Sequence, residues 1–467
     1  MSNAPETGQK SAARAGPHMV YPLAMQEQAG RDLRKLVPRS QHAGWTSPAH
    51  RADPVQTLID SGRDRIADLL PIRYDRMRQS AFAFLRGSAA IMAADLASGP
   101  VSGPMVQACG DCHLANFGTF ASPEGTPVFD INDFDETLPA PFEWDIKRLA
   151  TSVAVDGRSR GLPDNTCRHL ARAAVHGYRS YMAALLRMDP LSVWQSRVNA
   201  VDALEGIEDL KLRERELKRL QIAADASRGG YPKLLERRKG EWRIKENPPL
   251  IYSLTGKKDG THEVAARAAF QSYRTTLPEE RQVLLNHYKL TDIAFKVVGI
   301  GSVGTFCAIG LFVSGDGDPL LLQLKEASKS VLAPYAGPGK YTNQGQRVVI
   351  GQRMIQATPD IFLGWTNDHG DDRHCYVRQL KDPRLALLGN TLADGALPYY
   401  AVLCGQVLAR AHARSGDAAI ILGYMGSGSA FDAAIAEFAM DYADQTNRDW
   451  RLFLEAIKAG QIEAHTP

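Results

Sequence analysis

Two short polar clusters in the first third of the chain combine carboxylates with an asparagine. Asp111 precedes Asn116 by five residues, and Asp133 and Asp135 follow a strand-like segment soon afterwards. A carboxylate can orient an acceptor hydroxyl, while an amide and a second carboxylate can hold Mg²⁺. This spacing favours phosphoryl transfer. We predict Asp111 as the general base, Asn116 and Asp133 as Mg²⁺ ligands, and Asp135 as a further metal ligand.

A glycine-rich cluster, GIGSVG, lies at residues 299–304, and Lys325 follows on the next strand-like segment. Backbone N–H groups of such a loop can approach phosphates, and a lysine can neutralise them. The residues predicted to bind ATP are therefore Gly299, Gly301, Ser302, Gly304 and Lys325. The pattern also matches a dinucleotide fingerprint, which requires a helix after the loop. Here Thr305 to Val313 is β-branched, aromatic and apolar, so we expect a glycine-rich hairpin instead.

Other polar residues near these clusters have a structural interpretation beside the functional one. His113 is a candidate catalytic residue that could orient Asp111 or Asp133, or a hydrogen-bonded structural histidine. Asp145 precedes a helical segment, and we expect it to brace the catalytic loop. The later string HARSGD looks like a displaced catalytic loop without the asparagine. We interpret it as a helix end whose Arg414 could form an ion pair inside the cleft.

The six cysteines are too few for a disulfide scaffold, and we expect free thiols. Cys109 to His113 formally matches the CxxCH pattern of covalent haem attachment. A haem protein would need export, for which the N-terminal residues show no signal. It would also leave the glycine cluster and Lys325 unexplained. We therefore keep haem attachment only as a third, minor alternative.

The polar clusters also carry a resemblance to known families. The stretch from Gly110 to Ala150 resembles the loop region of aminoglycoside phosphotransferases and related small-molecule kinases. Those have a Gly-Asp-x-His-x-x-Asn loop, an Ile-Asp-Phe metal motif and a later aspartate before Leu-Ala. About residues 30–460 resemble a bacterial family, domain of unknown function 2252. The segments that carry this likeness are AFAFLRGSAAIMAADL, CGDCHLANFG, NDFDETLPAPFEWD, KVVGIGSVGT, LLLQLKEA, NQGQRVVIGQR and LARAHARSGD. The resemblance implies a kinase-like protein.

Two features depart from ordinary kinases. There the glycine loop and lysine precede the catalytic loop, whereas here they follow it. We infer a circularly permuted order, which is tolerable when chain ends lie close together at the surface. The lysine also lacks its usual glutamate partner, because the predicted helix at 346–356 contains Gln346 and Gln352 but no acid. We expect Lys325 to pair with Asp133 or with Glu326.

The surrounding pattern predicts the elements that must position these residues. Apolar spacing predicts helices at Ala81–Leu96, Glu143–Val155, Pro163–Met188, Ala200–Asp225, Pro278–Lys289, Gln346–Gln356 and from Leu397 to the end. Strand-like segments are Met105–Ala108, Val128–Asn132, Phe295–Val313, Leu320–Leu324, Ile361–Gly364 and Cys375–Leu380. Ser314 to Asp318 predicts a hairpin turn.

These elements predict an α+β, protein-kinase-like two-lobed fold, circularly permuted, with a mostly helical large lobe and a small antiparallel β lobe. The expected units are a partly irregular extension (1–50), a helical lobe with the catalytic and metal loops (51–289), a β-rich nucleotide-binding lobe (290–382) and C-terminal helices completing the large lobe (383–467).

The composition is that of a water-soluble globular protein, with 44% hydrophobic and 23% charged residues. The net charge of +3 gives no electrostatic argument for nucleic-acid or membrane partners, and we expect a cytoplasmic protein. The leading interpretation is an ATP- and Mg²⁺-dependent phosphotransferase of the small-molecule kinase type with an unidentified acceptor. The alternative is a nucleotide-binding pseudokinase or an AMP-transferring enzyme.

Overall fold

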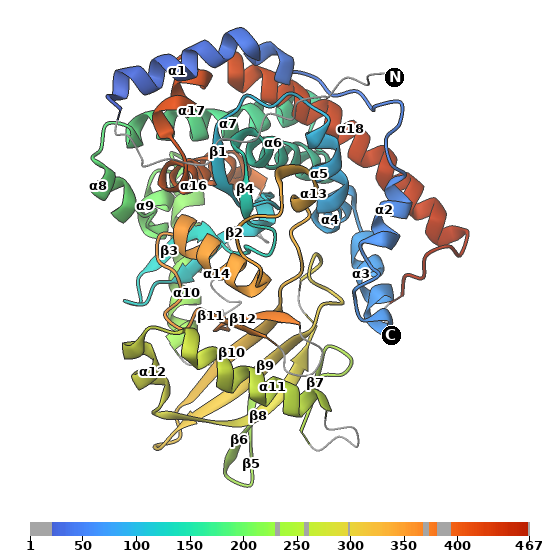
Figure 1. The fold of residues 1–467 in the computed structure, drawn as a ribbon, viewed down its shortest axis with the longest axis vertical. Coiled ribbons are helices and arrows are strands. Elements are labelled where there is room, and N and C mark those ends of the chain that lie inside the picture. Colours follow the sequence, from blue (N-terminus) through green and yellow to red (C-terminus); the bar gives the residue numbers. More distant parts are fainter. Residues whose placement is uncertain are drawn as a thin grey trace, which may run out of the picture.

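The computed structural model describes residues 21–228, 234–255, 261–297, 299–367, 373–380 and 394–465. Most helices gather in one part of the molecule and a large antiparallel sheet lies in the other (Figure 1). The expected α+β class is thus confirmed. The boundary expected at 382–383 and the first twenty residues of the predicted extension lie outside the described residues.

The helical part is built around four long helices, α6 (Phe142–Ser159), α7 (Asp164–Leu185), α16 (Leu397–Ser415) and α18 (Ala430–Lys458). Helix α6 is buried along nearly its whole length, as its run of Leu, Val and Ala residues requires. The extension expected to be partly irregular contains a helix that was not predicted, α1 (Leu23–Leu36), which packs against α17 (Ala418–Met425). Glycines at the crossing allow this approach, because a Cβ on Gly30 would lie 2.1 Å from a backbone oxygen of α17.

The large sheet has six antiparallel strands in the order β11-β12-β10-β9-β8-β7. Their bounds are β7 (Ile251–Ser253), β8 (Tyr288–Lys296), β9 (Cys307–Ser314), β10 (Pro319–Glu326), β11 (Gly364–Asn367) and β12 (His374–Gln379). Strands β9 and β10 form the predicted hairpin. The edge strand β7 comes from residues well before 290, where the β-rich unit was expected to begin. Its partner β8 starts inside the segment predicted to be a helix at Pro278–Lys289.

Two small sheets position residues 105–141, called the catalytic segment after the catalytic loop predicted within it, between the helices and the large sheet (Figure 1). The first pairs β1 (Met105–Ala108) with β4 (Leu138–Pro141), and β1 has the predicted bounds. The second pairs β2 (Phe117–Ala121) with β3 (Pro127–Ile131). No strand was predicted from the sequence at β2 or at β4. Each is four or five residues long, which is too short for a clear alternation of apolar and polar residues.

The segment predicted as one helix at Ala81–Leu96 consists of two, α4 (Ala81–Gly87) and α5 (Ala89–Ala97). They meet at Ser88, whose backbone lies outside the helical region. Gly87 packs against Met77, where a Cβ would lie 2.5 Å from the sulfur. The break therefore places the N-terminal end of α5 beside the catalytic segment.

The remaining elements cover the core or extend from it. The short helices are α2 (Pro54–Asp60), α3 (Leu70–Met77), α8 (Pro190–Gln195), α9 (Ala200–Glu205), α12 (Glu279–Leu285) and α13 (Ala333–Ala336). The longer ones are α10 (Leu210–Arg228), α11 (Thr261–Ser272) and α14 (Gln344–Ile355). A hairpin joins β5 (Leu235–Arg238) to β6 (Glu241–Ile244). The predicted helix at Ala200–Asp225 is therefore divided between α9 and α10. Within the described part of the chain, no single helix is long and apolar enough to span a membrane; α17 and α18, bent by 82°, pass that test only as a pair.

Candidate functional site

One cleft collects nearly all the residues singled out in the sequence. Asp111, His113, Asn116, Asp133 and Asp135 line it from the catalytic segment. Residues 299–302 and Glu326 line it from the large sheet, and α3, α4 and α5 supply its third wall. Its volume is about 160 Å³. Small-molecule pockets usually measure about 300–1,000 Å³, so this cleft is narrow.

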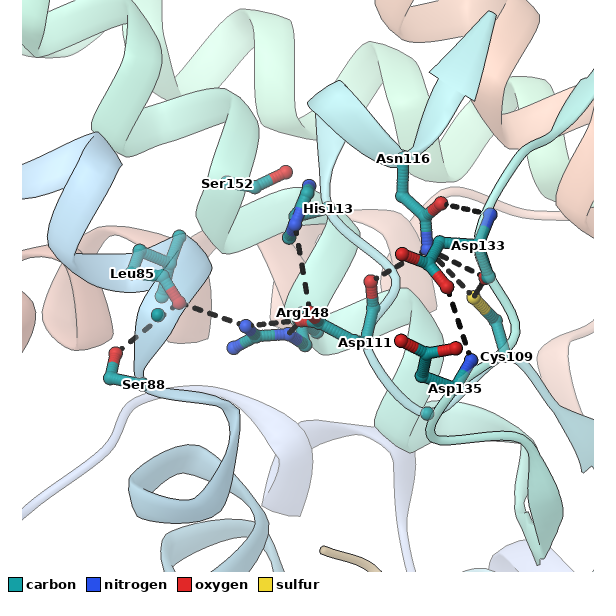
Figure 2. Close-up of polar contacts among 12 residues, drawn as sticks. Leu85, Ser88, Cys109, Asp111, His113, Asn116, Asp133, Asp135, Arg148 and Ser152 are labelled. Atoms are coloured by element: carbon teal, nitrogen blue, oxygen red, sulfur yellow. Dashed lines mark hydrogen bonds and ion pairs between the residues drawn. The ribbon is translucent and has the colours of Figure 1, made fainter. Parts of the chain in front are cut away.

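Asp111 is held from the rear by an arginine. The Nε of Arg148, on α6, donates to Asp111 Oδ1 at 2.6 Å, and its Nη2 donates to the carbonyl of Leu85 at 2.9 Å (Figure 2). His113 Nε2 lies 3.6 Å from the other carboxylate oxygen, too far for a hydrogen bond. Burial lowers the pKa of His113 to about 3. The imidazole is therefore neutral near pH 7, and Arg148 orients the carboxylate.

The Asn116 side chain ties the two polar clusters together. Its Oδ1 accepts from the backbone N–H of Asp133 at 2.6 Å, and its Nδ2 donates to the carbonyls of Asp111 and Asp133 (Figure 2). These contacts fix the two backbones against each other. The amide thus braces both loops, and Oδ1 keeps one lone pair for another donor or a cation.

Lys325, which is not itself among the residues that line the cleft, contacts the carboxylates of the predicted metal loop from β10. Its Nζ lies 2.8 Å from Asp135 and 3.8 Å from Asp133, although Lys325 and Asp135 are 190 residues apart in sequence. Asp135 also accepts from Tyr376 at 2.6 Å and from Ser302 at 3.0 Å. Lys325 does not pair with Glu326, which accepts from the backbone of Phe306. Its closest acid is Asp135, which we had expected to bind metal.

The three charged groups have displaced pKa values. Burial raises the pKa of Asp133, and the adjacent Asp135 carboxylate raises it further. Burial also raises the pKa of Asp135, but two neighbours outweigh this effect. The charge and hydrogen bond of Lys325, together with the hydrogen bond from the Tyr376 hydroxyl, hold the pKa of Asp135 well below its usual range. The carboxylates outweigh burial at Lys325 and raise the pKa of its ammonium. Asp133 is therefore more basic than Asp135, and it accepts fewer hydrogen bonds.

The glycine cluster forms the turn between β8 and β9, so no helix follows it. Gly299 and Gly304 have φ values of 68° and 92°, which disfavour other residues. Arginines from the helical part hold its carbonyls: Arg76 donates to Gly299, and Arg65 donates to Val303 at 2.5 Å. The loop is thereby fixed over the cleft, and its hairpin geometry is the predicted one.

A buried network supports the catalytic segment from below. Asp145 accepts from the backbone N–H groups of Cys109 and Gly110 at 2.6 and 3.0 Å. His412 Nε2 lies 3.2 Å from Asp145, and its Nδ1 bonds to the Tyr178 hydroxyl. Asp145 thus braces the loop as expected. The string HARSGD contributes His412 to this network, whereas Arg414 lies over Trp194 and donates to backbone carbonyls outside the cleft, so the expected ion pair there was wrong.

The thiols of Cys109 and Cys112 are buried at 1% and 0% exposure, within the main hydrophobic core. Covalent haem attachment requires both thiols to face the cofactor. The cleft is lined by His113 and not by either cysteine. These residues therefore serve packing in this fold, and the haem alternative loses its geometric basis.

Four residues in or beside the cleft were not predicted from the sequence. Tyr376 and Arg148 hold the two key carboxylates, and Arg73 and Arg86 line the wall made by α3 and α4. Arg86 and Arg148 lie within segments that carry the family resemblance but were not predicted as site residues, and Arg73 and Tyr376 lie outside those segments. Arg148 is the only one with a positional signal, since it follows Asp145 by three residues on the same helix face.

The donor set fits a Mg²⁺ ion held mainly by substrate. Within the described residues, no cluster of three or more His, Cys, Asp or Glu side chains could hold a metal by itself. Mg²⁺ bound through phosphates needs only one or two carboxylates. Asp133 fits, because its side chain is 43% exposed and its Oδ2 accepts no hydrogen bond from described residues. Asp135 does not fit as arranged, because Tyr376, Ser302 and Lys325 occupy both its oxygens.

Comparison with known proteins identifies a family. The model of a family described as "Uncharacterized protein conserved in bacteria (DUF2252)" matches residues 65–456, and the chain belongs to that family. No curated protein and no solved structure matches the chain.

Proposed function

We propose that this member of the bacterial DUF2252 family is an ATP- and Mg²⁺-dependent phosphotransferase of the small-molecule kinase type. One observation carries the proposal. A glycine hairpin and three aspartates from a distant segment line one cleft, and a buried lysine of the adjoining sheet contacts two of those aspartates. These are the parts that phosphoryl transfer needs, since its catalysis is mostly positioning and charge stabilisation. The circularly permuted, kinase-like arrangement belongs to the same proposal.

In this mechanism the chain positions the two reactants and receives one proton. The acceptor oxygen bonds to the γ-phosphorus, the bond to the β,γ-bridging oxygen breaks, and the hydroxyl proton passes to Asp111. Arg148 and the Leu85 carbonyl fix the orientation of that carboxylate. Backbone N–H groups of residues 299–304 cover the phosphates, and Lys325 contacts them from the sheet.

Asp133 and the free lone pair of Asn116 are the residues that would hold Mg²⁺. When bound, the ion neutralises charge on the phosphates during transfer. Asp135 has a different task in the proposal. It anchors Lys325, the role that the missing helix glutamate has in other kinases, and the pair supplies the fixed cation at the phosphate end of the cleft.

One contact favours the alternative of nucleotide binding without phosphoryl transfer. Arg148 forms a charge-assisted bond to Asp111, and such a bond competes with the proton that a general base must accept. A pseudokinase, or an enzyme that transfers AMP, would tolerate this pairing.

Titration of the purified protein with ATP and Mg²⁺, followed by product analysis, separates these functions. The proposal expects a Mg²⁺-dependent rise in melting temperature and release of ADP with water or a hydroxyl compound as acceptor. Pyrophosphate release identifies AMP transfer, and binding without either product identifies a pseudokinase. Absence of any ATP effect on the folded protein contradicts all three.

A further inference from the structure

We propose that the wall formed by α3, α4 and the start of α5 is a binding site for an oxyanion, and that it recognises a phosphate or carboxylate group of the acceptor. The proposal rests on the function proposed above for its assignment to the acceptor. The anion site itself stands on independent geometry. It lies in the same cleft as Asp111 and beside the glycine cluster, since a Cβ on Gly301 would lie 3.5 Å from the backbone oxygen of Arg86.

Two arginines in this wall have unused donors. Arg73 is 2% exposed, and its Nη2 donates to the carbonyl of Gly87 at 2.7 Å. Its Nε and Nη1 are buried and have no hydrogen-bond partner, and neither has the buried Nε of Arg86. Neither arginine forms an ion pair with any carboxylate among the described residues. Leaving charged donors buried and unpaired is costly, so a ligand that accepts from them is expected.

The N-terminal end of α5 adds backbone donors at the same place. Ala89 and Ala90, its first two residues, line the cleft, and first-turn N–H groups have no acceptor within their helix. Ser88 does not cap this end, because its hydroxyl donates to the Leu85 carbonyl. Two free amides, the helix dipole and two guanidinium groups thus converge, which is the composition of a built oxyanion site.

The acidic residues of the cleft do not neutralise this wall. Four of the five lining carboxylates already have donors: Asp111 from Arg148, Asp135 from Lys325, Glu136 from the Val331 N–H and Glu326 from the Phe306 N–H. The fifth, Asp133, is the candidate Mg²⁺ ligand. Asp111 and Asp135 are thus paired with cations, while the donors left without partners in this wall belong to Arg73 and Arg86.

The position of the wall assigns the anion to the acceptor. The Leu85 carbonyl, one turn before α5, holds Arg148 and through it Asp111, the residue that orients the acceptor hydroxyl. The candidate phosphate-binding lysine belongs to a different element, β10, and is bonded to Asp135. An acceptor with an anionic group on α5 would place a neighbouring hydroxyl beside Asp111.

Calorimetric titration with inorganic phosphate tests the site, with and without a saturating, non-hydrolysable ATP analogue and Mg²⁺. Wild-type protein should bind phosphate under both conditions. Arg86→Gln should weaken phosphate binding about tenfold or more, because it removes charge-assisted hydrogen bonds, while its affinity for the analogue changes little. Arg73→Gln should act in the same direction if it remains folded. Arg63→Gln is the matched control, since that exposed arginine pairs with Asp60 on the surface.

Three results overturn the proposal: no phosphate binding by folded wild-type protein, unchanged binding in Arg86→Gln, or displacement of phosphate by the analogue. The last result assigns the site to the terminal phosphate of the nucleotide. Phosphate binding that depends on Arg86 in a protein that does not bind the analogue supports the anion site and overturns the nucleotide-dependent function.

Discussion

The carboxylates Asp133 and Asp135 lie two residues apart and have different surroundings. Asp135 accepts from three side chains, whereas Asp133 faces the cleft with one oxygen free. Asp133→Asn should therefore lower Mg²⁺-dependent turnover by about a hundredfold or more while the melting temperature changes little, because it removes a candidate ligand and no buried bond. Initial rates at several Mg²⁺ concentrations, with thermal unfolding of the same samples, measure both effects. Unchanged turnover removes Asp133 from the site.

Asp135→Asn should lower the free energy of unfolding strongly, unlike Asp133→Asn. The substitution leaves Lys325, whose side chain is 2% exposed, without its nearest anion. Breaking a buried ion pair in this way costs about 3 kcal/mol. Urea unfolding of Asp135→Asn and Asp133→Asn measures the contrast. Equal loss of stability in the two variants would show that Lys325 does not depend on Asp135.

His113 makes the folding stability depend on pH. Burial lowers its pKa from 6.5 to about 3 in the folded protein, so the unfolded chain binds a proton first as the pH falls. Its contribution is fully present above about pH 6.5 and is lost as the pH falls toward 3. Between pH 7 and 5 the free energy of unfolding should fall by about 2 kcal/mol through this residue.

Urea unfolding of wild type and His113→Gln at pH 7 and 5 isolates that contribution. The variant should lose about 2 kcal/mol less than wild type over this interval. His50→Gln, at an exposed position, serves as the control. An identical pH dependence in wild type and His113→Gln contradicts a neutral, buried imidazole.

Among single residues, the sequence identified those that belong to motifs. Asp111, Asn116 and Asp133 line the cleft, and Lys325 contacts Asp133 and Asp135 without lining it. Asp145 braces the loop before Asp111. The arginines of the helical wall were not identified, because an arginine in an amphipathic helix carries no sign of which side its guanidinium occupies. Nor could spacing distinguish Asp135 from Asp133 as the partner of Lys325.

At the scale of elements, the glycine hairpin depends on two kinds of glycine. Gly304 has φ of 92°, and a Cβ there would lie 3.0 Å from Arg65, whereas a Cβ on Gly301 would make only an ordinary contact. Gly304→Ala should therefore destabilise the protein by about 1–2 kcal/mol and weaken ATP binding. Gly301→Ala should leave the free energy of unfolding within about 0.5 kcal/mol of wild type. Urea unfolding and ATP titration of the pair provide the measurements, and equal effects would contradict the observed loop conformation.

The break between α4 and α5 was not predicted from the sequence, and of the unpredicted features it affects the site most. AFAFLRGSAAIMAADL has strong helix formers on both sides of Gly87 and Ser88, and local propensity favours continuity. Tertiary packing of Gly87 on Met77 decides otherwise. The β9–β10 hairpin was predictable because its turn residues and strand composition agree, whereas the three-residue β7 has too little pattern to detect.

At the scale of the whole molecule, the cleft depends on contacts between segments far apart in the chain. Arg347, on α14, donates to the carbonyls of Asp135, Thr137 and Ser328, and Glu136 accepts from the N–H of Val331. These bonds join the catalytic segment to the β-rich part. A single sequence indicates that both parts exist but not that they meet. The prediction that they flank one ligand rested on the chemistry of phosphoryl transfer.

Hydrogen exchange with and without ATP and Mg²⁺ tests most directly whether this cleft binds a nucleotide. One ligand should protect the backbone amides of residues 299–306 and of the Asp111–Asn116 loop together, because both segments line the same cleft. The backbone amides of the Asp133–Glu136 loop should be protected with them. In Asp133→Asn, the portion of this protection that depends on Mg²⁺ should be lost. Protection of the glycine hairpin without the Asp111–Asn116 loop, or of neither, would contradict a nucleotide site shared between the two.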